Sequence, residues 1–132
     1  MNVLYFSFVR FCSSIREPTR LAEVVLFHHV LGLTDGVREF AERLASEAHR
    51  VHTPDLYDGA VATNLDAGFR IKNSIDDELL AERAERALDG LGAELVYAGM
   101  SLGVMTAQRM AQTRPDARGA LLYEACVPIS GE

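Results

Sequence analysis

The sequence has few of the residues that build disulfide frameworks, zinc centres or basic binding surfaces. Cys12 and Cys126 are its only cysteines, and neither stands in a CxxC or Cys/His spacing. Lys72 is its only lysine, and the net charge of −6 disfavours binding to nucleic acid or to an anionic membrane. We therefore expect two reduced thiols in a cytoplasmic protein, with no disulfide and no metal site.

Long apolar runs are also absent, because no run reaches the length of a membrane span. Residues 1–11 are apolar, but Arg10 interrupts them and no cationic segment precedes them, which argues against a signal peptide. Apolar residues make up 48% of the 132, enough for a single globular domain with a real core.

Residues 1–21 differ in composition from the rest of the chain. Four of the ten aromatic residues lie here within seven positions: Tyr5, Phe6, Phe8 and Phe11. This segment is either an extra edge strand or a stretch that the fold does not need, and the residues do not decide between the two. We expect the main domain to occupy residues 22–132.

From Ala22 onward the chain alternates between strand and helix patterns. Strands are predicted at 23–28, 50–54, 94–98 and 119–123, and the first is a continuous apolar run typical of a strand covered on both faces. Helices are predicted from an N-cap at Asp35, from a capping-box-like start at Ser74 and Asp77, and from about Leu102. Residues 55–73 are interpreted as a polar loop. The order predicts an α/β fold of three layers with a mostly parallel sheet.

Residues 99–103 read Gly-Met-Ser-Leu-Gly and lie between a buried strand and a helix. A Gly-x-Ser-x-Gly motif at such a junction forms a nucleophile elbow, in which Ser101 occupies a strained turn. Small residues at Gly99 and Gly103 let the strand and the helix approach each other without a Cβ clash. The alternative is an ordinary glycine-rich turn.

At these positions the chain resembles the dienelactone hydrolase family, a branch of the α/β-hydrolase fold. The resemblance runs from about residue 22 to residue 131. It rests on the strand and loop at 24–33, on the Thr-Pro-Asp-Leu-Tyr segment at 53–57, and on the elbow at 97–103. The chain departs from the family pattern at two positions. Many members carry a cysteine where this chain has Ser101, and the family's glutamate after the first strand falls here on His29.

The resemblance implies acyl transfer from a small ester or lactone to water, with no cofactor. Ser101 would be the nucleophile, and the backbone N–H groups of Leu102 and Val30 would bind the developing oxyanion. Arg70 lies where the family carries an arginine that binds the substrate carboxylate, although an ordinary solvated arginine is the alternative. A thioesterase or an acyltransferase would use the same elbow.

A serine nucleophile needs a base, and in this fold the order along the chain is serine, acid, histidine. No histidine follows Ser101. His29, at the end of the first strand, is one candidate base, although His28 and His29 can equally bond to backbone there. Glu124, at the end of the last predicted strand, is a candidate orienting acid.

The missing histidine suggests a truncated hydrolase, the N-terminal part of an α/β-hydrolase fold without its final strands. The strand at 119–123 would then be an uncovered apolar edge, so we expect self-association through it. A non-catalytic remnant that only binds a ligand or partner is the alternative from another functional class.

Overall fold

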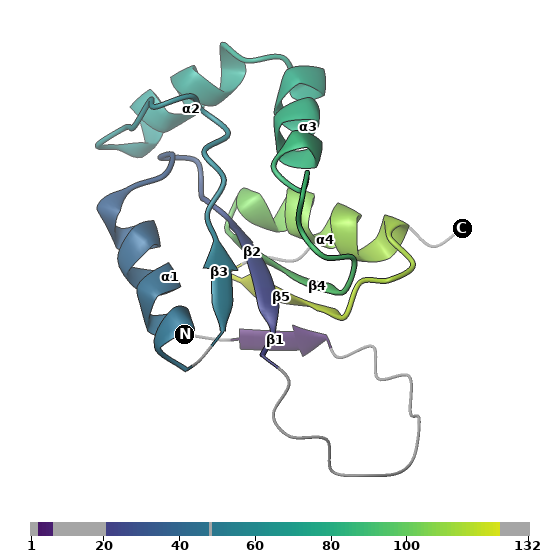
Figure 1. Cartoon of the computed structure of the whole chain (residues 1–132). Coiled ribbons are helices and arrows are strands. Elements are labelled where there is room, and N and C mark those ends of the chain that lie inside the picture. The colour runs from purple at the N-terminus through teal and green to yellow at the C-terminus, as the bar shows by residue number, and fades with distance from the viewer. Residues whose placement is uncertain (1–2, 7–20, 48, 125–132) are drawn as a thin grey trace, which may run out of the picture.

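The computed structural model describes residues 3–6, 21–47 and 49–124 (Figure 1). Five strands form one sheet in the order β1-β5-β4-β2-β3. The strands are β1 (Val3–Phe6), β2 (Glu23–Phe27), β3 (Arg50–His52), β4 (Leu95–Met100) and β5 (Gly119–Tyr123). The helices are α1 (Asp35–Ser46), α2 (Leu65–Asn73), α3 (Asp77–Arg86) and α4 (Gly103–Thr113). Cys12 and Cys126 lie outside the described residues.

The predicted α/β fold with a mostly parallel sheet is confirmed. β2 pairs in parallel with both β3 and β4, and β4 pairs in parallel with β5. The carboxyl ends of these four strands therefore meet at one edge of the sheet, where sites in α/β folds are built. The register places Phe27 of β2 opposite Gly99 of β4, and Met100 of β4 opposite Tyr123 of β5.

Two apolar layers hold the helices against the two faces of the sheet. On one face Val37 and Ala41 of α1 pack with Val24 and Leu26 of β2. On the other face α3 and α4 pack over the alternate residues of the same strands, among them Phe27 and the fully buried Tyr97. Successive strand residues point to opposite faces, which is why each central strand feeds both layers. Figure 1 shows α1 on one side of the sheet and α4 on the other.

Residues 55–73 are not a continuous loop, because α2 occupies Leu65–Asn73. Asn64 caps this helix by accepting a hydrogen bond from the Ala67 N–H at 2.9 Å. The helix was missed because its large apolar residues form no core-facing stripe: Leu65 and Phe69 are 62% and 49% exposed, and Ile71 is partly buried against the core. The buried residue of α2 is Gly68, which carries no hydrophobic signal.

Two predicted helix starts were also wrong. The N-cap of α1 is Thr34 rather than Asp35, and its hydroxyl accepts a hydrogen bond from the Val37 N–H. Ser74 forms no capping box with Asp77. It is the C-cap of α2, and its hydroxyl donates to the Ile71 carbonyl at 2.7 Å.

The outer edge of β5 is not uncovered, because β1 pairs with it in antiparallel orientation along Val3–Phe6. That pairing removes the free edge on which we based self-association, so the expectation of an exposed β5 was wrong. Self-association itself stays a prediction. Residues 7–20 lie outside the described residues, so the status of residues 1–21 as a separate segment also stays a prediction.

Tyr57 carries a buried hydroxyl that makes no hydrogen bond in the described structure. Burial raises the pKa of this phenol, because the charged form would lose its hydration. Replacing Tyr57 by phenylalanine removes an unsatisfied polar group and keeps the ring. We expect the free energy of unfolding in urea to stay unchanged or to rise by up to about 1 kcal/mol. A loss of more than about 1 kcal/mol would show that the hydroxyl has a partner in solution.

Candidate active site

Ser101 occupies a strained turn between β4 and α4, as a nucleophile elbow requires. Its φ is +50°, a left-handed conformation that non-glycine residues rarely adopt, and its side chain is exposed. The Ser101 N–H donates to the Tyr123 carbonyl at 3.0 Å, and the Ser101 carbonyl accepts from the Val104 N–H at 3.0 Å. The first bond fixes the turn to β5, and the second belongs to the first turn of α4. The two hydrogen bonds therefore hold Ser101 in its strained backbone conformation from both sides.

The two glycines of the motif are needed for space, as the sequence predicts. A Cβ on Gly99 would lie 2.4 Å from the Gly103 carbonyl oxygen. A Cβ on Gly103 would lie 2.3 Å from the carbonyl oxygen of Phe27 and 2.6 Å from that of His28. The first turn of α4 therefore lies directly against the carboxyl end of β2, beside the loop that carries Val30.

Leu102 and Val30, the residues assigned to the oxyanion, both keep a free backbone N–H. Among residues 3–6, 21–47 and 49–124, neither N–H donates a hydrogen bond. Val30 lies in a turn that is closed by a 3.1 Å hydrogen bond from the Gly32 N–H to the His29 carbonyl. Gly32 has φ +95°, and a Cβ there would lie 2.5 Å from the Ala60 carbonyl oxygen, so this turn requires glycine. Free N–H groups are the donors that a developing oxyanion needs.

α2 supports this turn from outside. A Cβ on Gly68 would lie 2.8 Å from the Val30 carbonyl oxygen, so the helix packs directly on the peptide that follows the candidate donor. Gly32 and Gly68 were not identified from the sequence as parts of the site. A glycine after the first strand and a glycine inside a helical stretch are the signals that point to such close approaches.

His29 faces its own loop rather than Ser101. Its Nδ1 accepts a hydrogen bond from the Leu31 N–H at 3.3 Å, which leaves the proton of the neutral ring on Nε2. In the described part of the chain no hydrogen bond joins His29 to Ser101. The structure therefore gives His29 a bond to backbone, and its role as a base stays a prediction.

His28 is a buried residue with both ring nitrogens in use. Nε2 faces the Leu56 N–H at 3.1 Å and must accept, so Nδ1 carries the proton and donates to the His29 carbonyl at 2.7 Å. The ring also lies edge-on to Tyr57, with centroids 4.8 Å apart. Burial lowers the pKa of His28, because the charged ring would lose its hydration.

This lowered pKa predicts a loss of stability in mild acid. Below pH of about 6.5 the unfolded chain takes up a proton at His28 that the folded chain resists. The free energy of unfolding should therefore fall as pH drops from about 6.5 through the lower pKa of the folded state. Urea unfolding from pH 7.5 to 5 measures the slope, and His28→Asn should make it shallower. An unchanged slope in that variant would show that His28 does not titrate on unfolding.

Glu124 and Ser101 follow neighbouring strands that are joined at Tyr123. The Tyr123 carbonyl accepts from Ser101, and the next residue, Glu124, has φ +68° and an exposed side chain. Two left-handed non-glycine residues thus stand side by side at this edge of the sheet. Within the described residues the Glu124 carboxylate contacts no histidine, so its role as an orienting acid stays a prediction.

Arg70 lies in α2 rather than in a loop, and its side chain is exposed. Two helical positions separate it from Gly68, which corresponds to a rotation of about 200° around the helix. Because Gly68 faces Val30, Arg70 projects from the opposite side of the helix. The structure does not bring Arg70 to Ser101, so substrate binding by this side chain stays a prediction.

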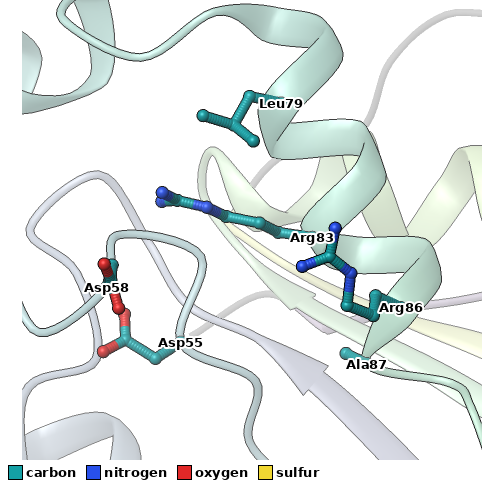
Figure 2. A pocket seen from close by; sticks show the side chains of 6 residues that line it. All are labelled: Asp55, Asp58, Leu79, Arg83, Arg86 and Ala87. Atoms are coloured by element: carbon teal, nitrogen blue, oxygen red, sulfur yellow. The ribbon is translucent and has the colours of Figure 1, made fainter.

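A separate hollow of about 480 Å³ lies between α3 and the loop after β3. Figure 2 shows Arg83 reaching from α3 toward the loop that carries Asp55 and Asp58. The Arg83 guanidinium donates to the Leu56 carbonyl at 2.7 Å, so it holds backbone. The full lining is Asp55, Asp58, Leu79, Arg83, Arg86 and Ala87. Among the described residues no cluster of three or more histidines, cysteines or carboxylates is placed to hold a metal ion.

Comparison with known proteins agrees with this geometry. The model of the dienelactone hydrolase family matches residues 11–118. Among solved structures the chain is similar to a dienelactone hydrolase-like promiscuous phosphotriesterase from metagenomic libraries, with a TM-score of 0.68 and 23% sequence identity. The match covers 87% of this chain and 52% of that one, so the chain spans about half the length of this neighbour. No curated protein matches the chain.

None of the described helices is both long enough and apolar enough to cross a membrane. The family match includes the elbow, the Pro-Asp-Leu-Tyr segment and the loop of Val30, and the structural match shows the α/β-hydrolase fold around them. The chain belongs to the dienelactone hydrolase family.

Proposed function

We propose that this chain carries the nucleophile and the oxyanion donors of a hydrolase that acts on small esters or lactones. Ser101 Oγ forms a bond to the acyl carbon, the bond from that carbon to the alcohol oxygen breaks, and the alcohol leaves with a proton. Water then attacks the acyl-serine and releases the acid. The N–H groups of Leu102 and Val30 stabilise the negative oxygen in both steps.

This proposal rests on Ser101, which has an exposed side chain and a left-handed backbone conformation. A φ of +50° costs free energy in a serine, and a strained residue persists only where the surrounding structure holds it. Here the strain presents a hydroxyl at the carboxyl edge of a parallel sheet, and the N–H groups of Leu102 and Val30 have no acceptor in the described chain. An ordinary glycine-rich turn would have no need of a serine in this conformation.

The proton of Ser101 has to pass to a base during attack. The fold places that histidine after the nucleophile in chain order, and none follows Ser101 in this sequence. We therefore assign the nucleophile and the donors to this chain and assign no triad histidine within it. His29 is the alternative base, and it requires its ring to release the Leu31 N–H.

Covalent labelling by a fluorophosphonate tests the proposal on the chain as it is. Ser101 Oγ forms a bond to phosphorus, the phosphorus–fluorine bond breaks, fluoride leaves, and the hydroxyl proton passes to solvent or to a base. We expect labelling of the folded chain at Ser101 at least about 100-fold faster than that of the urea-unfolded chain, because one oxyanion donor is worth about that factor. Mass spectrometry of the labelled peptide identifies the site.

Two variants serve as controls for this labelling. Ser101→Ala should remove it, whereas Ser130→Ala changes a serine elsewhere in the chain and should leave it unchanged. His29→Ala tests whether His29 is the base. A loss of at least about tenfold in the labelling rate would assign the base to His29. Labelling no faster than in the unfolded chain would leave the non-catalytic binding module as the better account.

A phosphotriester is a second candidate for the class of bond that is cleaved. The structural neighbour is described as a promiscuous phosphotriesterase, and a phosphotriester also develops a negative oxygen on attack. A carboxylic ester, a thioester and a phosphotriester with the same chromogenic leaving group compare the acyl, thioesterase and phosphoryl alternatives directly. Among the three, we expect the carboxylic ester to react fastest.

A further inference from the structure

We propose that His28 is a positioning residue for catalysis, because its imidazole ties the segment at Leu56 to the turn that presents the Val30 N–H. This inference rests on the proposed function, since it concerns the oxyanion donor of that site. His28 itself is buried at 4% exposure and touches neither Ser101 nor the substrate position through any bond in the described chain. It acts through backbone.

The backbone of Leu56 is held on both sides of its Cα. Its N–H donates to His28 Nε2 at 3.1 Å, and its carbonyl accepts from the Arg83 guanidinium at 2.7 Å. Asp55 braces the same segment by accepting from the N–H groups of Tyr57 and Gly59, at 3.0 and 2.7 Å. Arg83 crosses from α3 to this loop (Figure 2), where it bonds the carbonyl of the Leu56–Tyr57 peptide unit and not the unit whose N–H faces His28.

The other side of the ring controls the turn. Nδ1–H donates to the His29 carbonyl at 2.7 Å, and the same carbonyl accepts from the Gly32 N–H at 3.1 Å. The plane of the peptide between His29 and Val30 is therefore set by two hydrogen bonds to one oxygen. The N–H of Val30 belongs to that same peptide unit, and the plane of a peptide unit is rigid. Fixing the carbonyl therefore fixes the direction of the candidate oxyanion donor.

Only the neutral ring can make both contacts. Protonation of Nε2 removes the acceptor for the Leu56 N–H and places a second donor beside Asp55, whose Oδ1 lies 4.0 Å away. The groups that face the ring are the Asp55 carboxylate, the neighbouring His29 imidazole and the edge-on ring of Tyr57. The neutral state is favoured by burial, so the Leu56 N–H keeps its acceptor near neutral pH and loses it in acid, while Nδ1–H stays on the His29 carbonyl.

Three variants separate this role from a merely structural one. His28→Phe keeps a ring of similar size and removes both hydrogen bonds. Arg83→Met is the matched control, because it removes the other backbone hydrogen bond of Leu56 and leaves the His29 carbonyl untouched. His28→Asn is the conservative variant, since its amide N–H can take the place of Nδ1–H.

The readouts are fluorophosphonate labelling of Ser101 and amide hydrogen exchange of the full chain. We expect His28→Phe to lower the maximal labelling rate by about 10- to 100-fold, with probe affinity changed by less than about twofold. Arg83→Met should change that rate by less than about threefold, and His28→Asn should recover at least part of it. Exchange at Gly32 should accelerate in His28→Phe relative to Val104. The wild-type labelling rate should fall in acid at a pH below about 6.5, the ordinary pKa of histidine, because burial lowers the pKa of His28.

The outcomes distinguish this inference from the proposed function. A wild-type chain that is not labelled overturns the proposed function, and Gly32 exchange in the His28 variants then still decides whether the ring fixes the turn. Equal rate losses in His28→Phe and Arg83→Met would show a structural role only and overturn the inference. If His28→Phe does not fold, His28→Leu, which also removes both hydrogen bonds, takes its place, and a rate loss no larger than that of Arg83→Met overturns the inference.

Discussion

Replacing Gly103 by alanine should destabilise the fold by about 3 kcal/mol, the upper part of the usual range for overpacking. The added Cβ would meet two backbone oxygens, that of Phe27 at 2.3 Å and that of His28 at 2.6 Å. Neither oxygen belongs to a flexible side chain, so α4 or the end of β2 has to move. Either movement also displaces the elbow, and we expect labelling of Ser101 to fall with the stability. Urea unfolding measures the free energy.

Gly119→Ala is the matched control for this variant. Gly119 begins β5, and a Cβ there would meet no atom within 4 Å. Alanine restricts the unfolded chain more than glycine does, so stability should stay level or rise by up to about 1 kcal/mol. If Gly103→Ala were as stable as Gly119→Ala, the close packing of α4 on β2 would not exist in solution.

The elbow could be predicted from the sequence because its requirements are local. A buried strand, a serine between two glycines and an amphipathic helix specify the turn, and the structure places Ser101 at φ +50° where these meet. The central sheet could also be predicted from the sequence, since β2 and β4 are continuous apolar runs. The interpretation of Gly99 and Gly103 as close-approach residues is confirmed by the backbone atoms that a Cβ would meet.

The features that the sequence did not predict depend on contacts between segments that are distant along the chain. α2 exposes Leu65 and Phe69 and packs through Gly68 and the partly buried Ile71, so periodicity gave no clear signal for it. The partners of His28 lie 28 residues away at Leu56 and one residue away at His29, and only the folded chain shows that one ring serves both. The pairing of β1 with β5 joins opposite ends of the described chain, and no pattern in either strand specifies it.

Replacing Phe27 by alanine should cost about 3–5 kcal/mol, the range for deleting a buried aromatic side chain. Phe27 is fully buried in β2, a central strand, and packs in the layer between the sheet and α3 and α4. The cavity would open beside the strand end that supports both Gly103 and the loop of Val30. Urea unfolding monitored by circular dichroism should show a lower midpoint with a similar slope.

Phe69→Ala tests whether this cost comes from burial rather than from loss of an aromatic ring as such. Phe69 is 49% exposed on α2, and alanine is a better helix former than phenylalanine. We expect a change below about 1 kcal/mol. If the two variants lost equal stability, α2 would be packed against something in solution that the described residues do not supply. A large difference would place the stabilising core between the sheet and α4, directly beneath the elbow, so that the free energy of folding maintains the strained conformation of Ser101.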